Sequence, residues 1–362
     1  MSAITIGGDL IHYEKLGRGR PVILIHGWVG SWRYWIPLMQ KLHLKFSVYT
    51  LDLIGFGDST KDPNNYTVDA QVKMLEQFLD QLGIAKTAMV GHGLGALVAI
   101  RFAGKHPDKV ARLMLSSLPL YNPGDLENRI PAGTSVKLTG NTRYSLSPSI
   151  EDATGGQYSD NTIATIDKTI ASRGTNVGGD MTIASSSGSG VLNDSPTVRR
   201  PINIDREALR RAAEERDKPK RNHLMESFND ATMTGLLERC FKQSEVEYGK
   251  LKIDVEKSDS QVLAKSAMGY EAGAFLDEIR QLTAPVVAVH GVDDPIFTVP
   301  NEDIWNYLTL SKEDVFVPIP LPDVRHFPML EHVAFPRLTS DFLTVPDISK
   351  LEIRERWRRR SR

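Results

Sequence analysis

The stretch that decides the fold is Met89–Ile100, which reads MVGHGLGALVAI. An apolar run leads into three alternating glycines, and a second apolar run follows them. This pattern predicts a buried strand, a very tight turn and a helix. We expect the residue at the tip of the turn to have positive φ, a conformation that glycine adopts with little steric penalty. That residue is Gly93, so the tip has no side chain to present.

Around this stretch, short apolar runs alternate with helical patterns. Helical spacing predicts helices over 68–82 and from about 94 to 106. We expect a hairpin over 4–16 that turns at Gly7–Gly8, followed by strands at 21–25, 46–51, 87–90, 110–115, 285–289 and 315–319. Alternating strands and helices predict an α/β fold with a mostly parallel sheet covered by helices. Ligands of such sheets bind at the carboxyl ends of the strands.

The alternation stops after the sixth strand, and the composition changes. Residues 141–198 are rich in Ser, Thr, Gly, Asn and Asp, which predicts a flexible insertion, with a polar hairpin at 162–166 as the alternative. Helical patterns return at Asp205, a candidate N-cap. We therefore predict a core formed by 1–120 and 274–350, a helical cap over 121–273 inserted after the sixth strand, and a basic tail over 351–362.

Composition limits the function classes. The 362 residues carry a net charge of -1, which argues against a protein that binds nucleic acid or membranes through its overall charge. Cys240 is the sole cysteine, so no internal disulfide can form, and a reducing compartment is expected. The start of the sequence lacks the pattern of a signal peptide, and no apolar run is long enough to span a bilayer. We expect a cytoplasmic protein.

Four groups of residues fall where predicted strands end. They are His26-Gly27-Trp28, the loop 52–59, the glycine turn 91–95, and the pair formed by 291–295 and 324–331. In order and spacing, over about residues 4–120 and 200–345, the chain resembles the cap-bearing α/β-hydrolases of the AB hydrolase-1 type. That family places a nucleophilic serine in a G-x-S-x-G turn, followed along the chain by an acid and a histidine.

The resemblance implies a role for each of these positions. Gly93 takes the place of the nucleophile, Asp294 that of the acid and His326 that of the base, with Asp293 as the competing acid. The backbone N–H groups of Trp28 and Leu94 would form the oxyanion hole, and neither depends on the side chain at position 93. His26, Gly27 and His92 would line or support the binding site.

A triad without its nucleophile predicts a pseudo-hydrolase that binds a small carbonyl or apolar compound. Loss of the nucleophile lowers kcat about 10⁶-fold in enzymes of this type. Two routes to an active ester-type hydrolase remain open: a displaced nucleophile at Ser116 or Ser117, or direct attack by a water that His326 activates. The third alternative is an inactivated variant of a serine hydrolase.

The remaining motifs favour simpler roles. A phosphate-binding turn is the alternative for 91–95, but its spacing does not fit G-x-G-x-x-G. We expect no metal or organic cofactor, because neither an H-E-x-x-H motif nor a Cys/His cluster is present. Asp52 and Asp58 are predicted to organise their loop, Ser59 to cap a helix, and Cys240 to be buried. The basic residues of the tail 353–362 allow weak contact with a membrane surface.

Overall fold

The computed structural model describes residues 2–129, 221–312 and 314–351, all of which belong to one compact unit. Its eight strands form one sheet in the order β1-β2-β4-β3-β5-β6-β7-β8. The strands are β1 Ser2–Ile6, β2 Asp9–Leu16, β3 Arg20–Ile25, β4 Phe46–Leu51, β5 Thr87–His92, β6 Val110–Ser116, β7 Val286–Gly291 and β8 Phe316–Leu321. All pairings from β4 to β8 are parallel, which confirms the predicted mostly parallel sheet.

The first two strands form the predicted hairpin. Gly7 and Gly8 both have positive φ, 60° and 99°, as a two-residue turn that matches the twist of the strands requires. The turn brings Ile6 opposite Asp9, and β2 then pairs antiparallel with β4. The hairpin therefore extends the edge of the parallel sheet.

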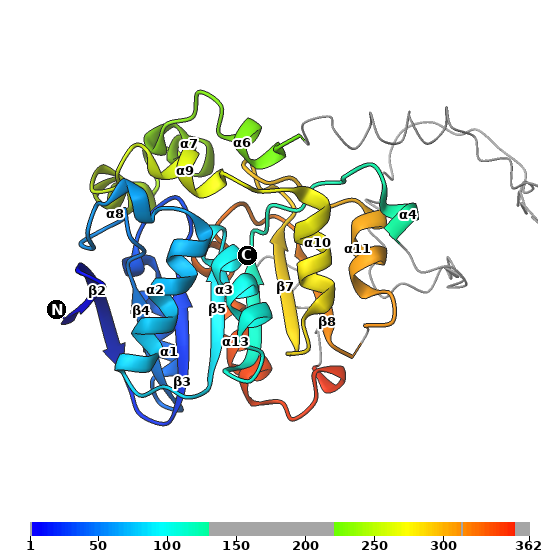
Figure 1. Cartoon of the computed structure of the whole chain (residues 1–362), viewed down its shortest axis with the longest axis horizontal. Helices are drawn as coiled ribbons and strands as arrows, with labels where there is room; N and C mark the ends of the chain where they lie inside the picture. Colours follow the sequence, from blue (N-terminus) through cyan, green and yellow to red (C-terminus); the bar gives the residue numbers. More distant parts are fainter. Residues whose placement is uncertain (1, 130–220, 313, 352–362) are drawn as a thin grey trace, which may run out of the picture. The chain divides into compact units, whose positions relative to one another are not determined.

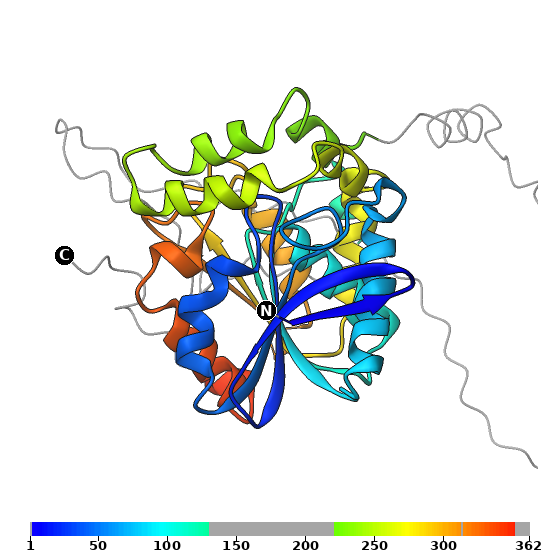
Figure 2. The same ribbon diagram turned by 90° about the vertical axis from the view of Figure 1, so that its left-hand side faces the viewer.

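The central strands are buried on both faces. Every residue of β4, β5 and β7 is buried, as their continuous apolar sequences predict. Helices cover both faces of the sheet, as Figure 2 shows: α1 packs with α13 on one face, and α2, α3, α10 and α11 contact one another in series on the other. These helices are α1 Ile36–Leu42, α2 Val68–Gln81, α3 Leu94–Lys105, α10 Ala272–Gln281, α11 Glu302–Thr309 and α13 Phe335–Thr344.

Short helices after β6 lie over one end of the sheet (Figure 1). They are α6 His223–Ser227, α7 Met233–Cys240, α8 Val246–Glu256 and α9 Val262–Ala267. Hydrogen bonds join them to the loops that follow β3 and β4: Ser266 on α9 accepts from the Trp28 side chain, and the Asp259 N–H donates to the Gly55 carbonyl. They therefore cover the carboxyl ends of the strands, where a cap was predicted. The other helical segments are α4 Leu126–Arg129, α12 Pro328–Glu331 and the 3₁₀ turns Trp32–Trp35, Pro63–Asn65 and Ile348–Lys350.

Several sequence predictions lie outside the described residues. These are the flexible insertion at 141–198, the alternative hairpin at 162–166, the N-cap at Asp205 and the tail contact at 353–362.

Candidate active site

The glycine turn has the predicted geometry. Strand β5 ends at His92, and Gly93 follows with φ 51° and ψ -112° as the N-cap of α3. The flanking glycines allow close backbone contact: a Cβ on Gly91 would lie 2.6 Å from the Gly95 carbonyl oxygen, and a Cβ on Gly95 would overlap the Ile25 carbonyl. The turn therefore needs glycine at 91 and 95, where a side chain has no space. At 93, glycine suits the positive φ of the backbone.

The side chain of Trp28 lies in tight contact with the Cβ position of Gly93. A Cβ built on Gly93 would lie 3.2 Å from Cε3 of the indole and 3.3 Å from Cζ3. Trp28 is 1% exposed and has edge-on contacts with Phe228 and Phe297, at 5.0 and 5.5 Å between ring centres. The resemblance assigned Trp28 a backbone role, and sequence reasoning did not foresee its side chain at this position.

The predicted acid and base form a buried pair. His326 donates from Nδ1 to Oδ2 of Asp294 at 2.9 Å, and both side chains are buried. The other carboxylate oxygen, Oδ1, accepts the backbone N–H groups of Ile296 and Phe297 at 2.8 and 3.0 Å. Asp293, the competing candidate, is exposed, and Asp294 is the carboxylate that bonds to His326.

Charge and hydrogen bonds keep this carboxylate ionised. Burial alone would raise the pKa of Asp294, but the neighbouring His326 and the bonds at the carboxylate hold it at about 2. With Nδ1 donating to Asp294, the free acceptor of a neutral imidazole is Nε2. Nε2 of His326 is buried and has no partner among the described residues. The pair therefore presents one unpaired nitrogen, the atom that a general base uses.

The backbone of His326 is fixed by a chain of hydrogen bonds that starts beside the glycine turn 91–95, called the elbow from here on. The Gly27 N–H donates to Tyr34 Oη at 2.6 Å, and Tyr34 is bonded to Nδ1 of His92 at 2.9 Å. Nε2 of His92 then bonds to the His326 carbonyl at 2.9 Å. Because a carbonyl only accepts, His92 donates from Nε2 and accepts the Tyr34 hydroxyl at Nδ1. His92 thus connects the turn to the base.

Burial keeps both side chains of this chain of bonds uncharged. It holds the pKa of His92 well below its usual range and raises that of Tyr34 well above. The ring of His92 lies 4.7 Å from the ring of His326, which brings the residue before Gly93 against the base. Tyr34 has no motif around it, and only its contact across the fold identifies it.

The N–H groups assigned to the oxyanion hole are available. Within the described part of the chain, neither the N–H of Leu94 nor that of Trp28 is hydrogen-bonded to a protein acceptor. Leu94 is the first residue of α3, where backbone N–H groups have no partner inside the helix. These groups are the kind of donors that stabilise an oxyanion.

The two candidates for a displaced nucleophile, Ser116 and Ser117, do not bond to His326 through its imidazole. The Ser117 hydroxyl donates to the His326 carbonyl at 2.8 Å, and the Ser116 hydroxyl donates to the Gly91 carbonyl at 3.3 Å. Both hydroxyls therefore contact backbone oxygens instead of the imidazole. Cys240 is buried as predicted, and burial raises the pKa of its thiol, which disfavours a reactive thiolate.

His26 is fully buried and bonded to backbone groups. Its Nδ1 donates to the Gly27 carbonyl at 2.8 Å, and its Nε2 accepts the Leu53 N–H at 2.9 Å. Burial lowers its pKa, so the neutral ring joins the loop after β3 to the loop after β4. This geometry supports a packing role behind the turn.

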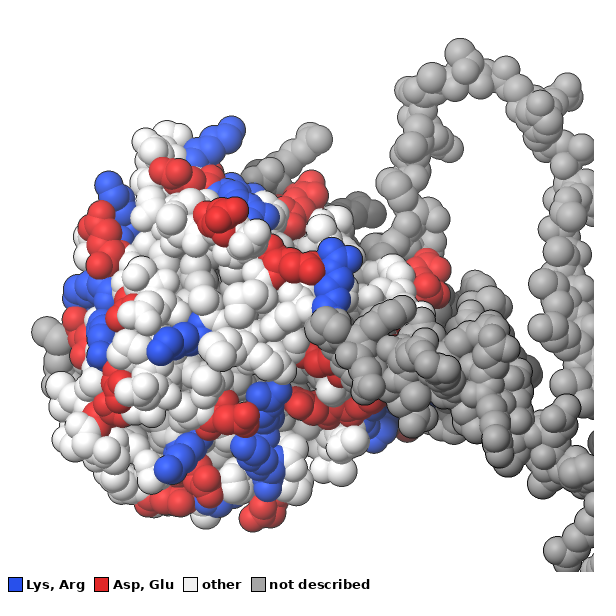
Figure 3. All heavy atoms as spheres, turned by 45° about the horizontal axis from the view of Figure 1, so that its top comes forward, with Lys and Arg blue, Asp and Glu red and all other residues white. Residues whose placement is uncertain are grey.

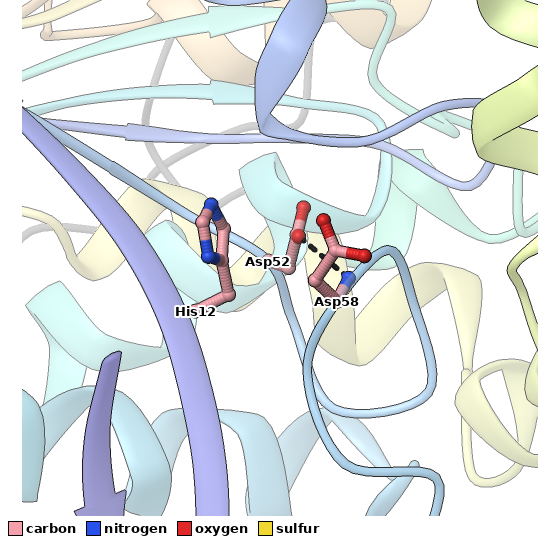
Figure 4. Close-up of side chains that lie close together, drawn as sticks. All are labelled: His12, Asp52 and Asp58. Carbon is pink, nitrogen blue, oxygen red and sulfur yellow. Dashed lines mark hydrogen bonds between the residues drawn. The ribbon is translucent and has the colours of Figure 1, made fainter. Parts of the chain in front are cut away.

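A second cluster lies between strand β2 and the loop after β4 (Figure 4). His12, Asp52 and Asp58 bring one nitrogen and two carboxylate oxygens within 4.8 Å of one another. Both oxygens of Asp52 accept backbone N–H groups at 2.9 Å. Asp58 pairs with Lys257 at 2.6 Å and with Arg33 at 3.3 Å. These bonds account for both carboxylates as loop organisers, the role predicted for them.

The predicted cap at Ser59 is wrong. Its hydroxyl donates to the Asp52 carbonyl at 2.7 Å and accepts the His12 N–H at 3.0 Å, which ties its loop to β2. The N-cap of the next α-helix, α2, is Thr67, which accepts the Ala70 N–H. A bond to a neighbouring strand takes the place of the local capping bond.

Charge is mixed on the face shown in Figure 3. Lys and Arg side chains alternate there with Asp and Glu, and neither sign forms a continuous patch over the described residues. Within the described ranges, no helix has both the length and the apolar character that a membrane crossing requires.

Comparison with known proteins agrees with the fold described above. Residues 20–149 match the family described as alpha/beta hydrolase fold. The soluble epoxide hydrolase of Corynebacterium sp. (strain C12) is 35% identical over 122 residues, which are 33% of this chain and 43% of that protein. The acetyltransferase component of an acetoin cleaving system from Pseudomonas putida is 35% identical over 112 residues, 30% of each chain. The matches thus span less than half the length of these relatives.

Among solved structures, the enol-lactonase from Burkholderia xenovorans LB400 has a TM-score of 0.57 at 15% identity, covering 95% of this chain and 100% of the other. At this identity the likeness concerns the fold. The sheet order, the elbow at Gly93 and the family match agree with it. The chain therefore has the α/β-hydrolase fold, and residues 20–149 match the family of that description.

Proposed function

We propose that this chain is a pseudo-hydrolase that binds a small carbonyl or apolar compound and does not form an acyl-enzyme. One observation carries the proposal: the Asp294–His326 pair is complete, while Gly93 has no atom that could attack a substrate. An acyl-enzyme route needs that atom, and its loss lowers kcat about 10⁶-fold. The oxyanion donors and the binding site alone leave a residual acceleration of about 10³–10⁴-fold over water.

The surroundings of the pair support a small ligand of limited polarity. Trp28, Phe228 and Phe297 form a buried aromatic group in edge-on contact, and Phe297 also contacts the ring of His326 at 5.6 Å. The polar atoms here that lack a hydrogen-bond partner among the described residues are Nε2 of His326 and the N–H groups of Trp28 and Leu94. Two donors beside one acceptor suit a carbonyl compound that also has a hydroxyl group.

The test separates binding from covalent chemistry. We expect a fluorophosphonate probe to leave residue 93 unlabelled, because no hydroxyl is present there. We expect small aromatic or aliphatic carbonyl compounds to change the His326 imidazole resonances in an NMR titration. Labelling that requires His326, or turnover with an acyl-enzyme burst, would show that a nucleophile exists and would reject the proposal.

A second candidate is hydrolysis by direct attack of water. The observation that favours it is the unpaired Nε2 of His326, because Asp294 fixes the tautomer in which this nitrogen accepts a proton. This route predicts slow ester turnover without a covalent intermediate. The activity should fall steeply in His326→Ala, measured on purified protein with short aryl esters. Turnover that survives His326→Ala unchanged excludes the route.

A further inference from the structure

The Trp28 side chain connects three parts of the molecule. Its loop follows β3 in the core, its indole contacts the Cβ position of Gly93, and its Nε1 donates to Ser266 Oγ on α9 at 2.8 Å. The two bonded residues are 238 positions apart in the chain, and both are buried. Ser266 in turn donates to the Leu263 carbonyl at 3.2 Å, within the same helical segment. The cap thus holds the indole over the elbow.

Backbone hydrogen bonds and close packing hold the elbow beside the indole. The Gly93 N–H donates to the Ser116 carbonyl at 2.9 Å, and the Gly93 carbonyl accepts the N–H groups of Ala96 and Leu97. On its other side, the Gly95 Cβ position is closed by the backbone carbonyls of Ile25 and His26. A Cβ added at Gly93 would therefore require the indole of Trp28 to shift by a few tenths of an ångström, and a larger group over Gly93 would have to move it further.

We propose that Trp28 is a gate over position 93, which the cap holds shut through Ser266. A ligand reaches the space beside Gly93 only when the indole swings out, and this movement breaks its bond to Ser266. We call Gly93 and Trp28 a matched pair, because the indole lies in tight contact with the Cβ position of residue 93. The ligand that opens the gate is the small compound of the proposed function, whereas the pairing of 93 with 28 depends on packing alone.

A double-mutant cycle tests the matched pair. Gly93→Ala adds only a Cβ, and Trp28→Phe removes the second ring of the indole that this Cβ would meet. Both backgrounds carry the backbone strain at φ 51°, so the strain cancels in the cycle. We expect Gly93→Ala to raise the unfolding equilibrium constant at least about fivefold more in the native background than in the Trp28→Phe background, a coupling of the size found between contacting residues. Equal effects in the two backgrounds overturn the proposal.

A second readout follows the gate itself. In Gly93→Ser, we expect slow labelling of the new hydroxyl by a fluorophosphonate. The rate should rise about tenfold or more when Trp28→Phe is added, and by an intermediate factor with Ser266→Ala, which frees the indole without shrinking it. Labelling that is equally fast in all three proteins contradicts the gate.

Gly104 provides the matched control. It lies on α3 with no atom within 4 Å of its Cβ position, so Gly104→Ala should have the same effect on the unfolding constant with and without Trp28→Phe. The cycle also separates the two proposals. If the unaltered chain were to form an acyl-enzyme, the proposed function would fail, while the coupling between 93 and 28 would still stand or fall on the stability data.

Discussion

The two sides of the candidate site differ in what they retain. The elbow side has the backbone of a strand, a residue at positive φ and a helix, but Gly93 has no side chain there. The acid–base side keeps its chemistry complete, from Asp294 to the unpaired Nε2 of His326. A missing side chain at position 93 and a missing member of the acid–base pair would therefore have unequal structural costs. Glycine fits the elbow without strain, whereas removing one member of a buried pair leaves the other unpaired.

Removal of the acid is expected to have the largest effect. Asp294→Ala leaves Nδ1 of His326 and the N–H groups of Ile296 and Phe297 without an acceptor. The free energy of unfolding should fall by about 3–5 kcal/mol, as for other broken buried pairs. Asp294→Asn is the control, because its amide oxygen can still accept the two backbone N–H groups. Urea denaturation of both variants makes the comparison, and a loss below about 1 kcal/mol in Asp294→Ala would show that the pair has no structural role.

On the elbow side, the cost depends on which glycine changes. A Cβ on Gly95 overlaps backbone carbonyls that cannot rotate away, so Gly95→Ala should lower the free energy of unfolding by about 3 kcal/mol. Gly104→Ala on the same helix should raise it by about 0.5–1 kcal/mol, because Gly104 is exposed and alanine favours helix. Thermal or urea unfolding measures both. Equal effects at the two positions would mean that the elbow is not closely packed.

The acid–base side should also make stability depend on pH. Against the effect of burial, the neighbours of Asp294 lower its pKa from 3.8, the ordinary value of an aspartic acid side chain, to about 2 in the folded chain. A lowered folded pKa stabilises the fold above pH 4, and this contribution disappears as the pH falls toward 2. The loss is about 2 kcal/mol. Denaturation of the native chain and of Asp294→Asn at pH 5 and at pH 2.5 measures this loss. The free energy of unfolding should fall further between the two pH values in the native chain than in Asp294→Asn. No difference between the two chains contradicts the assignment of a charged Asp294.

Breaking the link between the two sides should have a smaller effect than removing Asp294. Tyr34→Phe removes the hydroxyl that joins the Gly27 N–H to Nδ1 of His92. Two buried groups then lack a partner, and stability should fall by about 1–3 kcal/mol. In the same variant, an NMR titration should show a raised His92 pKa or a new tautomer, which a purely packing role for Tyr34 would not produce. An unchanged His92 spectrum would contradict the proposed link through Tyr34.

Sequence reasoning found the backbone of the site but missed part of its packing. The strands and the elbow were predictable because buried parallel strands are continuous apolar runs and because the glycines at 91, 93 and 95 are local signals. Asp294 and His326 followed from a resemblance. Tyr34 and Ser266 lie on helical segments with no motif, and their partners are 58 and 238 positions away, so no local pattern could reveal them. Ser59 misled for the same reason, because its partner is a neighbouring strand.

Intact-mass measurement shows most directly whether this chain forms a covalent adduct. The unaltered chain and His326→Ala would each be exposed to an activated ester or a fluorophosphonate and then weighed by mass spectrometry. We expect an unchanged mass for both proteins and no burst of product, because no hydroxyl is present at position 93. A stoichiometric adduct on the unaltered chain that disappears in His326→Ala would contradict it, since the pair would then be activating a nucleophile.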